Sequence, residues 1–272
     1  MAKAKKPVNK KSTSLPRWLK WSLWTILILT GIALIYENKR YIRRAYRYFT
    51  HKYTKTQWKP SDFPLEYEIH GIDISHYQDV LDWKKLQAIN TLGDTLKMEF
   101  VIMKATEGMF KEDDAFADYW DEATANGLVR GAYHYFLPDR SVMLQANNFT
   151  TTVKLKKGDL PPVIDIEETR GKSKKEIVKA LRDFAKALEK EYKTKPIIYS
   201  NINFIEDYLA DDFKDYPFWI AHYYQREIAP PDSIRWLFWQ HSDKADILGI
   251  NGPVDANVFN GTRKDFQKLL IK

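Results

Sequence analysis

Short apolar segments recur along the chain from about residue 66, and stretches with a helical spacing of apolar residues separate most of them. Each segment has the length of a buried strand, and alternation of such strands with helices is typical of a parallel sheet. The pattern predicts eight strands, over residues 70–75, 99–105, 129–136, 161–167, 195–201, 217–223, 236–242 and 253–259. It therefore favours an α/β barrel of the (β/α)8 type.

Four helices are predicted between these strands, over residues 83–92, 113–126, 141–153 and 174–192. Ser173 and Glu176 have the spacing of a capping box at the start of the last one. The connections over 223–236 and 242–253 hold too little helical pattern for full crossovers. We therefore expect an irregular (β/α)8-like barrel whose final third is shortened and includes an antiparallel strand.

The N-terminal region has a different pattern. Residues 21–36 read WSLWTILILTGIALIY and carry no charge. This run is slightly short for a membrane span, but its terminal Trp and Tyr residues favour an uncleaved transmembrane anchor. A cleaved signal peptide is the main alternative, although no small-residue cleavage site follows. The predicted order is a basic tail over 1–20, the anchor over 21–36, a basic juxtamembrane stalk or linker over 37–65 and the barrel over 66–272.

Charge divides the chain at about residue 60. The net charge is +7, but residues 1–60 carry 15 Lys and Arg residues and a single acid, Glu37. The remaining residues include 28 bases and 35 acids, and this acidic balance argues against a nucleic-acid partner. Seven basic residues lie in 1–20 and seven in 37–56, so charge does not decide how the predicted anchor is oriented. The absence of Cys excludes disulfides and thiolate chemistry.

Acidic and aromatic residues lie toward the carboxyl ends of the predicted strands, where barrel enzymes hold their active sites. The candidate site residues are Asp73, Tyr133, Tyr135, Asp165, Glu167, Tyr199, Trp219, Gln240 and Asp255. Aromatic rings stack on sugar C–H faces, and carboxylates bond hydroxyls and transfer protons, so this set predicts a carbohydrate site. Packing inside the barrel is an equally good interpretation of Trp219.

The sequence Asp165-Ile166-Glu167 is the sharpest local feature of this set. Alternate residues of a strand point to one face, so both carboxylates are predicted to share the same space, with Cα atoms roughly 6.5–7 Å apart. Two close carboxylates cannot both ionise cheaply, so one of them is expected to keep a proton and act as a general acid. The alternative is a pair of solvated or helix-capping acids at the start of a loop.

Eight sequence blocks in order along the chain resemble glycoside hydrolase family 25, the peptidoglycan-cleaving lysozymes. They are GIDIS (71–75), FVIMKATEG (100–108), GLVRGAYHYF (127–136), PVIDIE (162–167), PIIYSN (196–201), WIAHY (219–223), FWQHS (238–242) and VDANVF (254–259). The resemblance implies a flattened β/α barrel that hydrolyses the β-1,4 bond between N-acetylmuramic acid and N-acetylglucosamine.

The resemblance also implies roles for single residues. Glu167 matches the family's general acid and Asp165 matches its partner in the DxE motif. Asp73 and Asp255 match two further acids of the site, and the tyrosines at 133, 135 and 199 match contacts near the cleaved sugar. Three mechanisms stay open for Asp165: it orients the substrate's 2-acetamido group for internal attack, attacks as a nucleophile, or activates water as a base.

The remaining expectations concern partners and location. Peptidoglycan is the expected substrate, and the lipid bilayer is an expected partner through the N-terminal helix. The protein is expected to be a monomer without cofactor or metal, in the cytoplasmic membrane as a single-pass protein with its barrel on the exoplasmic side. A non-catalytic, membrane-anchored glycan-binding protein is the alternative.

Overall fold

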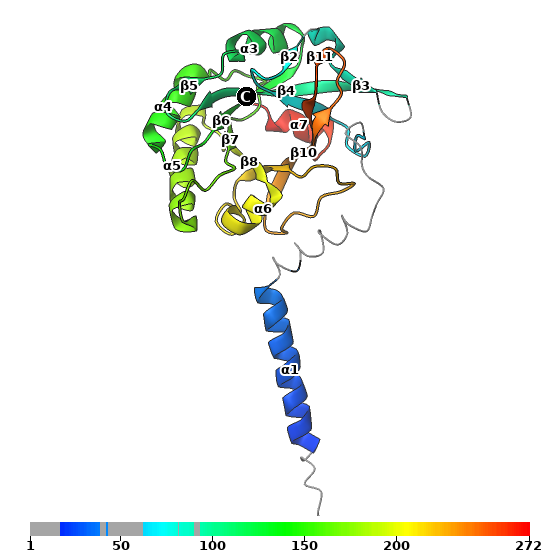
Figure 1. Ribbon diagram of the computed structural model, residues 1–272, viewed down its shortest axis with the longest axis vertical. Coiled ribbons are helices and arrows are strands. Elements are labelled where there is room, and N and C mark those ends of the chain that lie inside the picture. The colour runs from blue at the N-terminus through cyan, green and yellow to red at the C-terminus, as the bar shows by residue number, and fades with distance from the viewer. Residues whose placement is uncertain (1–16, 39–41, 43–61, 81, 90–92) are drawn as a thin grey trace, which may run out of the picture. The chain divides into compact units, whose positions relative to one another are not determined.

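Eight strands pair side by side and close into a barrel (Figure 1). The computed structural model describes residues 17–38, 42, 62–80, 82–89 and 93–272. The barrel strands are β1 (His70–Ile74), β4 (Thr95–Glu107), β6 (Val129–Tyr135), β7 (Val163–Asp165), β8 (Ile197–Asn201), β9 (Pro217–Ala221), β10 (Arg235–Ala245) and β12 (Val254–Phe259). All eight predicted strands are therefore present, with small differences at their ends.

The order around the barrel is β1-β12-β10-β9-β8-β7-β6-β4, and β4 closes it by pairing with β1. Neighbours pair in parallel except at β12, which runs antiparallel to both β1 and β10. The fully described connections from β9 to β10 and from β10 to β12 contain no helix. The prediction of a shortened final third with an antiparallel strand is thus confirmed.

Helices α3 (Phe116–Ala125), α4 (Val142–Thr152) and α5 (Lys174–Tyr192) connect successive parallel strands (Figure 1). The capping box at the start of α5 is present, with both of its reciprocal bonds between Ser173 and Glu176. Shorter elements are β2 (Asp79–Val80), η1 (Trp83–Lys85), β3 (Gln87–Ile89), β5 (Lys111–Glu112), α6 (Ile202–Phe204), η2 (Ile205–Leu209) and β11 (Ile250–Asn251). Helix α7 (Arg263–Leu269) follows the last strand.

The predicted helix over 83–92 is wrong. Within the described residues 83–89, only Trp83–Lys85 is helical, as a short 3₁₀ turn, which Asp82 caps by accepting from the N–H of Lys84. Gln87–Ile89 then forms strand β3, which pairs antiparallel with the start of β4. Ala88 is buried between two less buried neighbours, and this alternation has the period of a strand. The alternation covers only three residues, and the surrounding residues have good helix propensity, so the sequence pattern favoured a helix.

Side chains alternate between the two faces of the barrel wall. On β4, Val101 and Met103 point outward into the core under the helices, whereas Phe100 and Ile102 point inward. The inward apolar residues fill one end of the barrel, where Phe266 of α7 packs against Phe100. The opposite end of the barrel is formed by the carboxyl ends of the parallel strands. Polar side chains that point inward gather there, because apolar side chains fill the first end.

Close packing inside the barrel explains one glycine on β1. A Cβ atom at Gly71 would lie 2.5 Å from the ring of Phe100 on the neighbouring strand β4, far inside van der Waals contact. Any larger residue at this position would push these two strands apart. Because β1 also carries Asp73, glycine at this position helps to set where that carboxyl lies.

The N-terminal unit contains helix α1 (Arg17–Glu37), which includes the predicted anchor over 21–36. Among the described residues, no helix combines the length and the apolar character that a bilayer crossing requires. The prediction of a transmembrane helix is therefore not supported, although a helix does form over the predicted anchor. The predicted basic tail and stalk lie largely outside the described residues.

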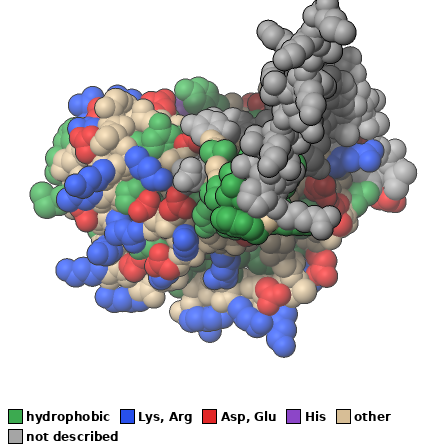
Figure 2. All heavy atoms as spheres, turned by 90° about the horizontal axis from the view of Figure 1, so that it is seen from below, with side chains coloured by type: hydrophobic (Ala, Val, Ile, Leu, Met, Phe, Trp, Pro, Cys, Tyr) green, Lys and Arg blue, Asp and Glu red, His purple; other side chains and the backbone are tan. Residues whose placement is uncertain are grey.

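Acidic and basic side chains are interspersed on the surface of the barrel. Figure 2 shows Lys and Arg side chains among Asp and Glu side chains over the face in view, with no continuous basic area among the coloured atoms. This distribution agrees with the acidic balance of the sequence beyond residue 60.

Candidate active site

Four carboxyl side chains gather at the carboxyl end of the barrel strands. Asp73 on β1 lies directly opposite Asp255 on β12 in the antiparallel register, and the two carboxyls share a hydrogen bond. Asp165 ends β7, and Glu167 follows two residues later on the same face and is hydrogen-bonded to it. Glu167 also lies within electrostatic range of Asp73. The acids that sequence analysis selected therefore form one cluster made of two hydrogen-bonded pairs.

Asp165 and Glu167 differ in exposure: Asp165 is buried, whereas Glu167 is exposed. Burial raises the pKa of Asp165 well above its usual value, and the nearby charge of Glu167 raises that pKa further. Partial loss of hydration also raises the pKa of Glu167. The ammonium group of Lys104 favours the ionised forms of both acids, but the loss of hydration outweighs it. Because two close carboxyls cannot both ionise cheaply, the ionised form of one opposes the ionisation of the other.

One oxygen of Asp165 has no partner in the described chain. Oδ1 of Asp165 is buried and accepts no hydrogen bond. A buried carboxylate oxygen without a donor is costly, and such an atom is often satisfied by water or a ligand. Asp165 thus offers a free acceptor beside the acid Glu167.

The second pair holds its proton on Asp255. Burial raises the pKa of Asp73 to about 6, against the opposing hydrogen bonds from Asn257 and Gln240. Burial and the nearby charge of Asp73 raise the pKa of Asp255 to about 9. Oδ2 of Asp73 accepts from Nε2 of Gln240 at 2.8 Å and from Nδ2 of Asn257 at 2.7 Å. Asp73 is therefore the ionised member near pH 7, and Asp255 is the neutral donor.

Two short chains of hydrogen bonds fix these amides. The hydroxyls of Tyr199 and Tyr223 donate to Oε1 of Gln240 at 2.7 and 2.8 Å, so its amide nitrogen must face Asp73. The indole N–H of Trp219 donates to Oδ1 of Asn257 at 2.8 Å and orients that amide in the same way. In both Gln240 and Asn257, the amide oxygen accepts from these donors and the amide nitrogen therefore donates to the Asp73 carboxylate.

Trp219 is 1% exposed, so it offers no open face for stacking on a sugar. The packing interpretation is the correct one for this residue, and its contact with the site passes through Asn257. Asn257 and Tyr223 were not among the predicted site residues. Asn257 lies two positions after Asp255 on the same strand, so the period of two along β12 was the signal that pointed to it.

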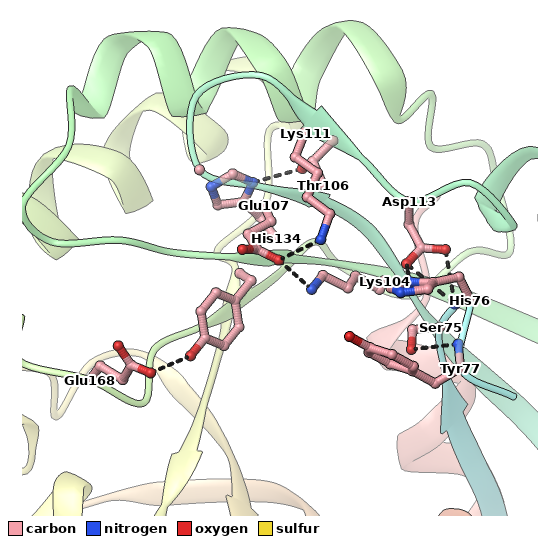
Figure 3. A network of polar contacts seen from close by, with 12 residues as sticks. Ser75, His76, Tyr77, Lys104, Thr106, Glu107, Lys111, Asp113, His134 and Glu168 are labelled. Carbon is pink, nitrogen blue, oxygen red and sulfur yellow. Dashed lines mark hydrogen bonds and ion pairs between the residues drawn. The ribbon is translucent and has the colours of Figure 1, made fainter.

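The predicted tyrosines surround the acids. Tyr133 is partly buried, and both the loss of hydration and the charges of Asp165 and Asp73 raise its pKa well above the usual value. Tyr135 donates from its hydroxyl to Oε1 of Glu168 at 3.3 Å (Figure 3). Nζ of Lys104 lies 5.2 Å from the centre of the Tyr135 ring.

A charge pair borders this side of the site. Nζ of Lys104 lies 2.6 Å from Oε2 of Glu107, and Lys111 lies on the other side of that carboxylate at 3.5 Å (Figure 3). Glu107 is thus engaged in ion pairs. The ion pair with Glu107 therefore holds in place the Lys104 ammonium group, which faces the acids.

The buried histidine of β6 belongs to the packing outside the barrel. Nδ1 of His134 lies 2.7 Å from Oγ1 of Thr106, and its Nε2 lies 3.3 Å from Oε1 of Gln145. Burial lowers the pKa of His134 to about 4, so the ring is neutral near pH 7. Within the described part of the chain, no group of three or more His, Cys, Asp and Glu side chains is arranged to hold a metal ion.

The raised pKa of Asp255 predicts a pH-dependent cost to folding. Below about pH 4 this carboxyl is protonated in both states, but at pH 8 the folded protein must keep a proton that the unfolded chain releases. Asp255→Asn removes this cost and keeps a donor toward Asp73. We expect the variant to raise the free energy of unfolding by on the order of 3 kcal/mol at pH 8, and by much less at pH 4. Urea unfolding at both pH values measures this, and a gain that does not change with pH would contradict it.

Comparison with known proteins places this geometry in a family. Residues 72–250 match the sequence profile described as Glycosyl hydrolases family 25. The chain belongs to glycosyl hydrolase family 25. It is 46% identical over 207 residues to the uncharacterized protein YegX of Escherichia coli K12, covering 76% of this chain and 75% of that protein. It is 29% identical over 208 residues to Lysozyme M1 of Streptomyces globisporus, covering 71% of this chain and 68% of that protein.

Solved structures of family 25 proteins share the fold. The bacterial lysozyme of Streptomyces coelicolor superposes with a TM-score of 0.66 at 29% identity, covering 74% of this chain and 96% of that one. A family 25 glycosyl hydrolase of Bacillus anthracis gives the same TM-score at 30% identity, covering 75% of this chain and 94% of that one. The family 25 chain described here is accordingly a glycoside hydrolase of the lysozyme type, and its α/β barrel is the family's fold.

Proposed function

We propose that this family 25 protein hydrolyses the β-1,4 bond between N-acetylmuramic acid and N-acetylglucosamine in peptidoglycan. The observation that carries the proposal is the close pair of Asp165 and Glu167 at the carboxyl end of the barrel, where loss of hydration raises the pKa of both acids. Such a pair can deliver a proton to a leaving oxygen and retain a negative charge beside the reacting carbon. The similarity to Lysozyme M1 supports the same assignment.

In the proposed reaction, Glu167 donates its proton to the glycosidic oxygen while the bond from that oxygen to the anomeric carbon breaks. The oxygen of the substrate's 2-acetamido group attacks the same carbon, and Asp165 accepts a hydrogen bond from the acetamido N–H. Water then adds to the anomeric carbon as the Glu167 carboxylate takes a proton from it. This step reopens the acetamido ring and returns the proton to Glu167. The product keeps the anomeric configuration of the substrate.

One feature of the acids favours this route. Oδ1 of Asp165 is a buried acceptor without a donor, as the acetamido N–H requires.

The products of peptidoglycan digestion test the proposed bond. Purified sacculi treated with the full chain are expected to release muropeptides whose reducing sugar is N-acetylmuramic acid, identified by mass spectrometry after borohydride reduction. A reducing N-acetylglucosamine would assign the protein to the other glycosidic bond. Release of no fragments, with binding to sacculi retained, would favour the alternative of a non-catalytic glycan-binding protein.

Peptidoglycan lies outside the cytoplasmic membrane, so the proposed substrate places the barrel in an extracytoplasmic compartment. Digestion of the barrel by a protease added to cells whose outer surface has been opened tests this location. The expected monomer stays a prediction, which sedimentation of the full chain measures.

The amide that orients Asp73 gives a prediction for the pH profile. Asn257→Leu removes one of the two amide donors to the Asp73 carboxylate, so the pKa of Asp73 is expected to rise above its present value of about 6. A neutral Asp73 stabilises developing positive charge on the sugar less well. We expect the acid limb of the profile of kcat/KM against pH to move upward by about one unit.

A milder variant is the control for this change. Trp219→Phe keeps an aromatic ring in the core and removes only the donor that orients Asn257. Its acid limb is expected to move in the same direction by a smaller amount. An unchanged limb in Asn257→Leu, in a variant that folds, would show that the ionisation of Asp73 does not limit the reaction.

A further inference from the structure

An exposed aromatic side chain stands close to the acid cluster. Tyr77 follows β1 and is 79% exposed, although most large aromatic side chains are largely buried in folded proteins. It comes four residues after Asp73, so at most about 14 Å of extended backbone separates the two. In Figure 3 the ring of Tyr77 extends from the end of β1 toward the side of the view that holds Lys104 and Glu168. Tyr77 therefore lies at the edge of the proposed active site.

The ring of Tyr77 is supported by the neighbouring His76. The two ring centres lie 4.0 Å apart with an interplanar angle of 38°. Nδ1 of His76 lies 2.7 Å from Oδ2 of Asp113, a carboxylate whose side chain is 1% exposed. The backbone N–H of His76 donates to the same carboxylate at 3.1 Å (Figure 3). One face of Tyr77 is thus backed by a fixed ring.

The carboxylate behind His76 belongs to the wall of the site. The backbone N–H of Asp113 donates to the carbonyl of Ala105 on β4 at 2.9 Å. Its charge acts on Tyr133 together with the charges of Asp165, Asp73 and Asp255. On the far side, the hydroxyl of Tyr119 on α3 donates to the carbonyl of Gln78 at 2.5 Å. The turn that carries Tyr77 is therefore fastened at both ends to the barrel and to α3.

We propose that Tyr77, backed by His76, is a stacking platform for a sugar ring of the glycan strand outside the cleaved bond. The inference rests on the proposed function, because it takes an extended chain of amino sugars as the ligand. A flat, exposed ring fixed before binding covers the apolar face of a sugar at a low entropic cost. Because Tyr77 lies outside the acid cluster, it holds substrate and transition state equally. Its contribution therefore falls on KM rather than on kcat.

Glycan length separates this platform from the catalytic centre. The full chain and its Tyr77→Ala variant are assayed on soluble peptidoglycan glycan strands sorted by number of sugars. For long strands, Tyr77→Ala is expected to raise KM about tenfold with kcat unchanged. For the shortest strands that are cleaved, the variant and the parent are expected to match. Tyr77→Trp, which keeps a flat ring, is expected to restore the preference for long strands.

Two further variants control for the loss of an exposed apolar side chain and for the support beneath Tyr77. Ile89 is 54% exposed on β3, beside the start of β4 and away from its carboxyl end, and Ile89→Ala is expected to leave KM unchanged at every length. His76→Ala is expected to raise KM for long strands less than Tyr77→Ala does. His76→Phe, which restores a ring under Tyr77, is expected to recover that loss.

Three results would overturn the platform: no change in Tyr77→Ala, an equal loss at all lengths, or a fall in kcat. Binding of the longest strands to Glu167→Gln and to Glu167→Gln/Tyr77→Ala, measured by calorimetry, keeps the inference independent of activity. A protein that cleaves no glycan would contradict the proposed function alone. Equal dissociation constants for the two inactive variants would contradict the platform, whatever the activity of the parent.

Discussion

Replacing Glu167 by Gln is expected to lower the rate of peptidoglycan hydrolysis by about 10²–10⁴-fold, the usual contribution of a general acid. Gln has the shape of Glu and accepts a hydrogen bond through its amide oxygen, but it has no proton to give to the glycosidic oxygen. The loss is expected in kcat, because proton transfer takes place only in the transition state. The measurement is the initial rate at which new reducing ends appear in purified sacculi.

A matched variant shows whether the loss comes from chemistry or from the missing charge. Glu191 is an exposed residue near the end of α5 on the outside of the barrel, and Glu191→Gln makes the same substitution there. This control is expected to keep the parent rate. Glu167→Gln is expected to fold at least as stably as the parent, because it removes one acid from a crowded pair. A folded Glu167→Gln protein with near-parent activity would mean that another group donates the proton.

The barrel was predictable because its strands carry strong local signals. Each strand is a short apolar run, and α5 begins at a capping box whose two residues identify the start without tertiary information. The region around Gln87–Ile89 was mispredicted because a three-residue strand has almost no periodicity of its own. It is a strand because the edge of β4 lies beside it, which is a tertiary cause.

The acids of the site were also predictable, but their partners were not. The alternation in Asp165-Ile166-Glu167 places both carboxyls on one face wherever the strand lies. The pairing of Asp73 with Asp255, by contrast, depends on the antiparallel closure of β1 against β12, two segments at opposite ends of the domain. The burial of Trp219 depends in the same way on the packing of the closed barrel, since an indole at a strand end fits a sugar platform equally well in sequence.

The polar groups around Asp73 show what maintains the cluster. Buried carboxyls oppose folding unless donors compensate for their lost hydration. Here Gln240 and Asn257 supply these donors, and tyrosine and tryptophan side chains hold both amides in the required orientation. The site therefore combines Asp73, which the amides keep ionised, with Asp255, which burial keeps neutral. The same barrel presents both acids to a single substrate.

Replacing Asp165 by Asn is expected to reduce kcat by at least about 10²-fold through a different cause from Glu167→Gln. Asn still accepts one hydrogen bond, so it can bind the acetamido N–H. It cannot stabilise the positive charge that develops as the acetamido oxygen bonds to the anomeric carbon. Substrate binding is expected to survive, because the lost interaction is strongest in the transition state. Initial rates and the dissociation constant for glycan strands separate these two effects.

The configuration of the first product decides which role Asp165 plays. Proton NMR of the parent reaction, recorded before mutarotation, is expected to show the β-anomer, as acetamido participation requires. An α-anomer would instead identify Asp165 as a base that activates water. Retention alone does not distinguish the acetamido group from a direct attack by Asp165. Substrates with a trifluoroacetamido group make that distinction: the weaker acetamido nucleophile should slow the reaction strongly, whereas direct attack by Asp165 would be far less sensitive and would leave a sugar ester on the carboxylate.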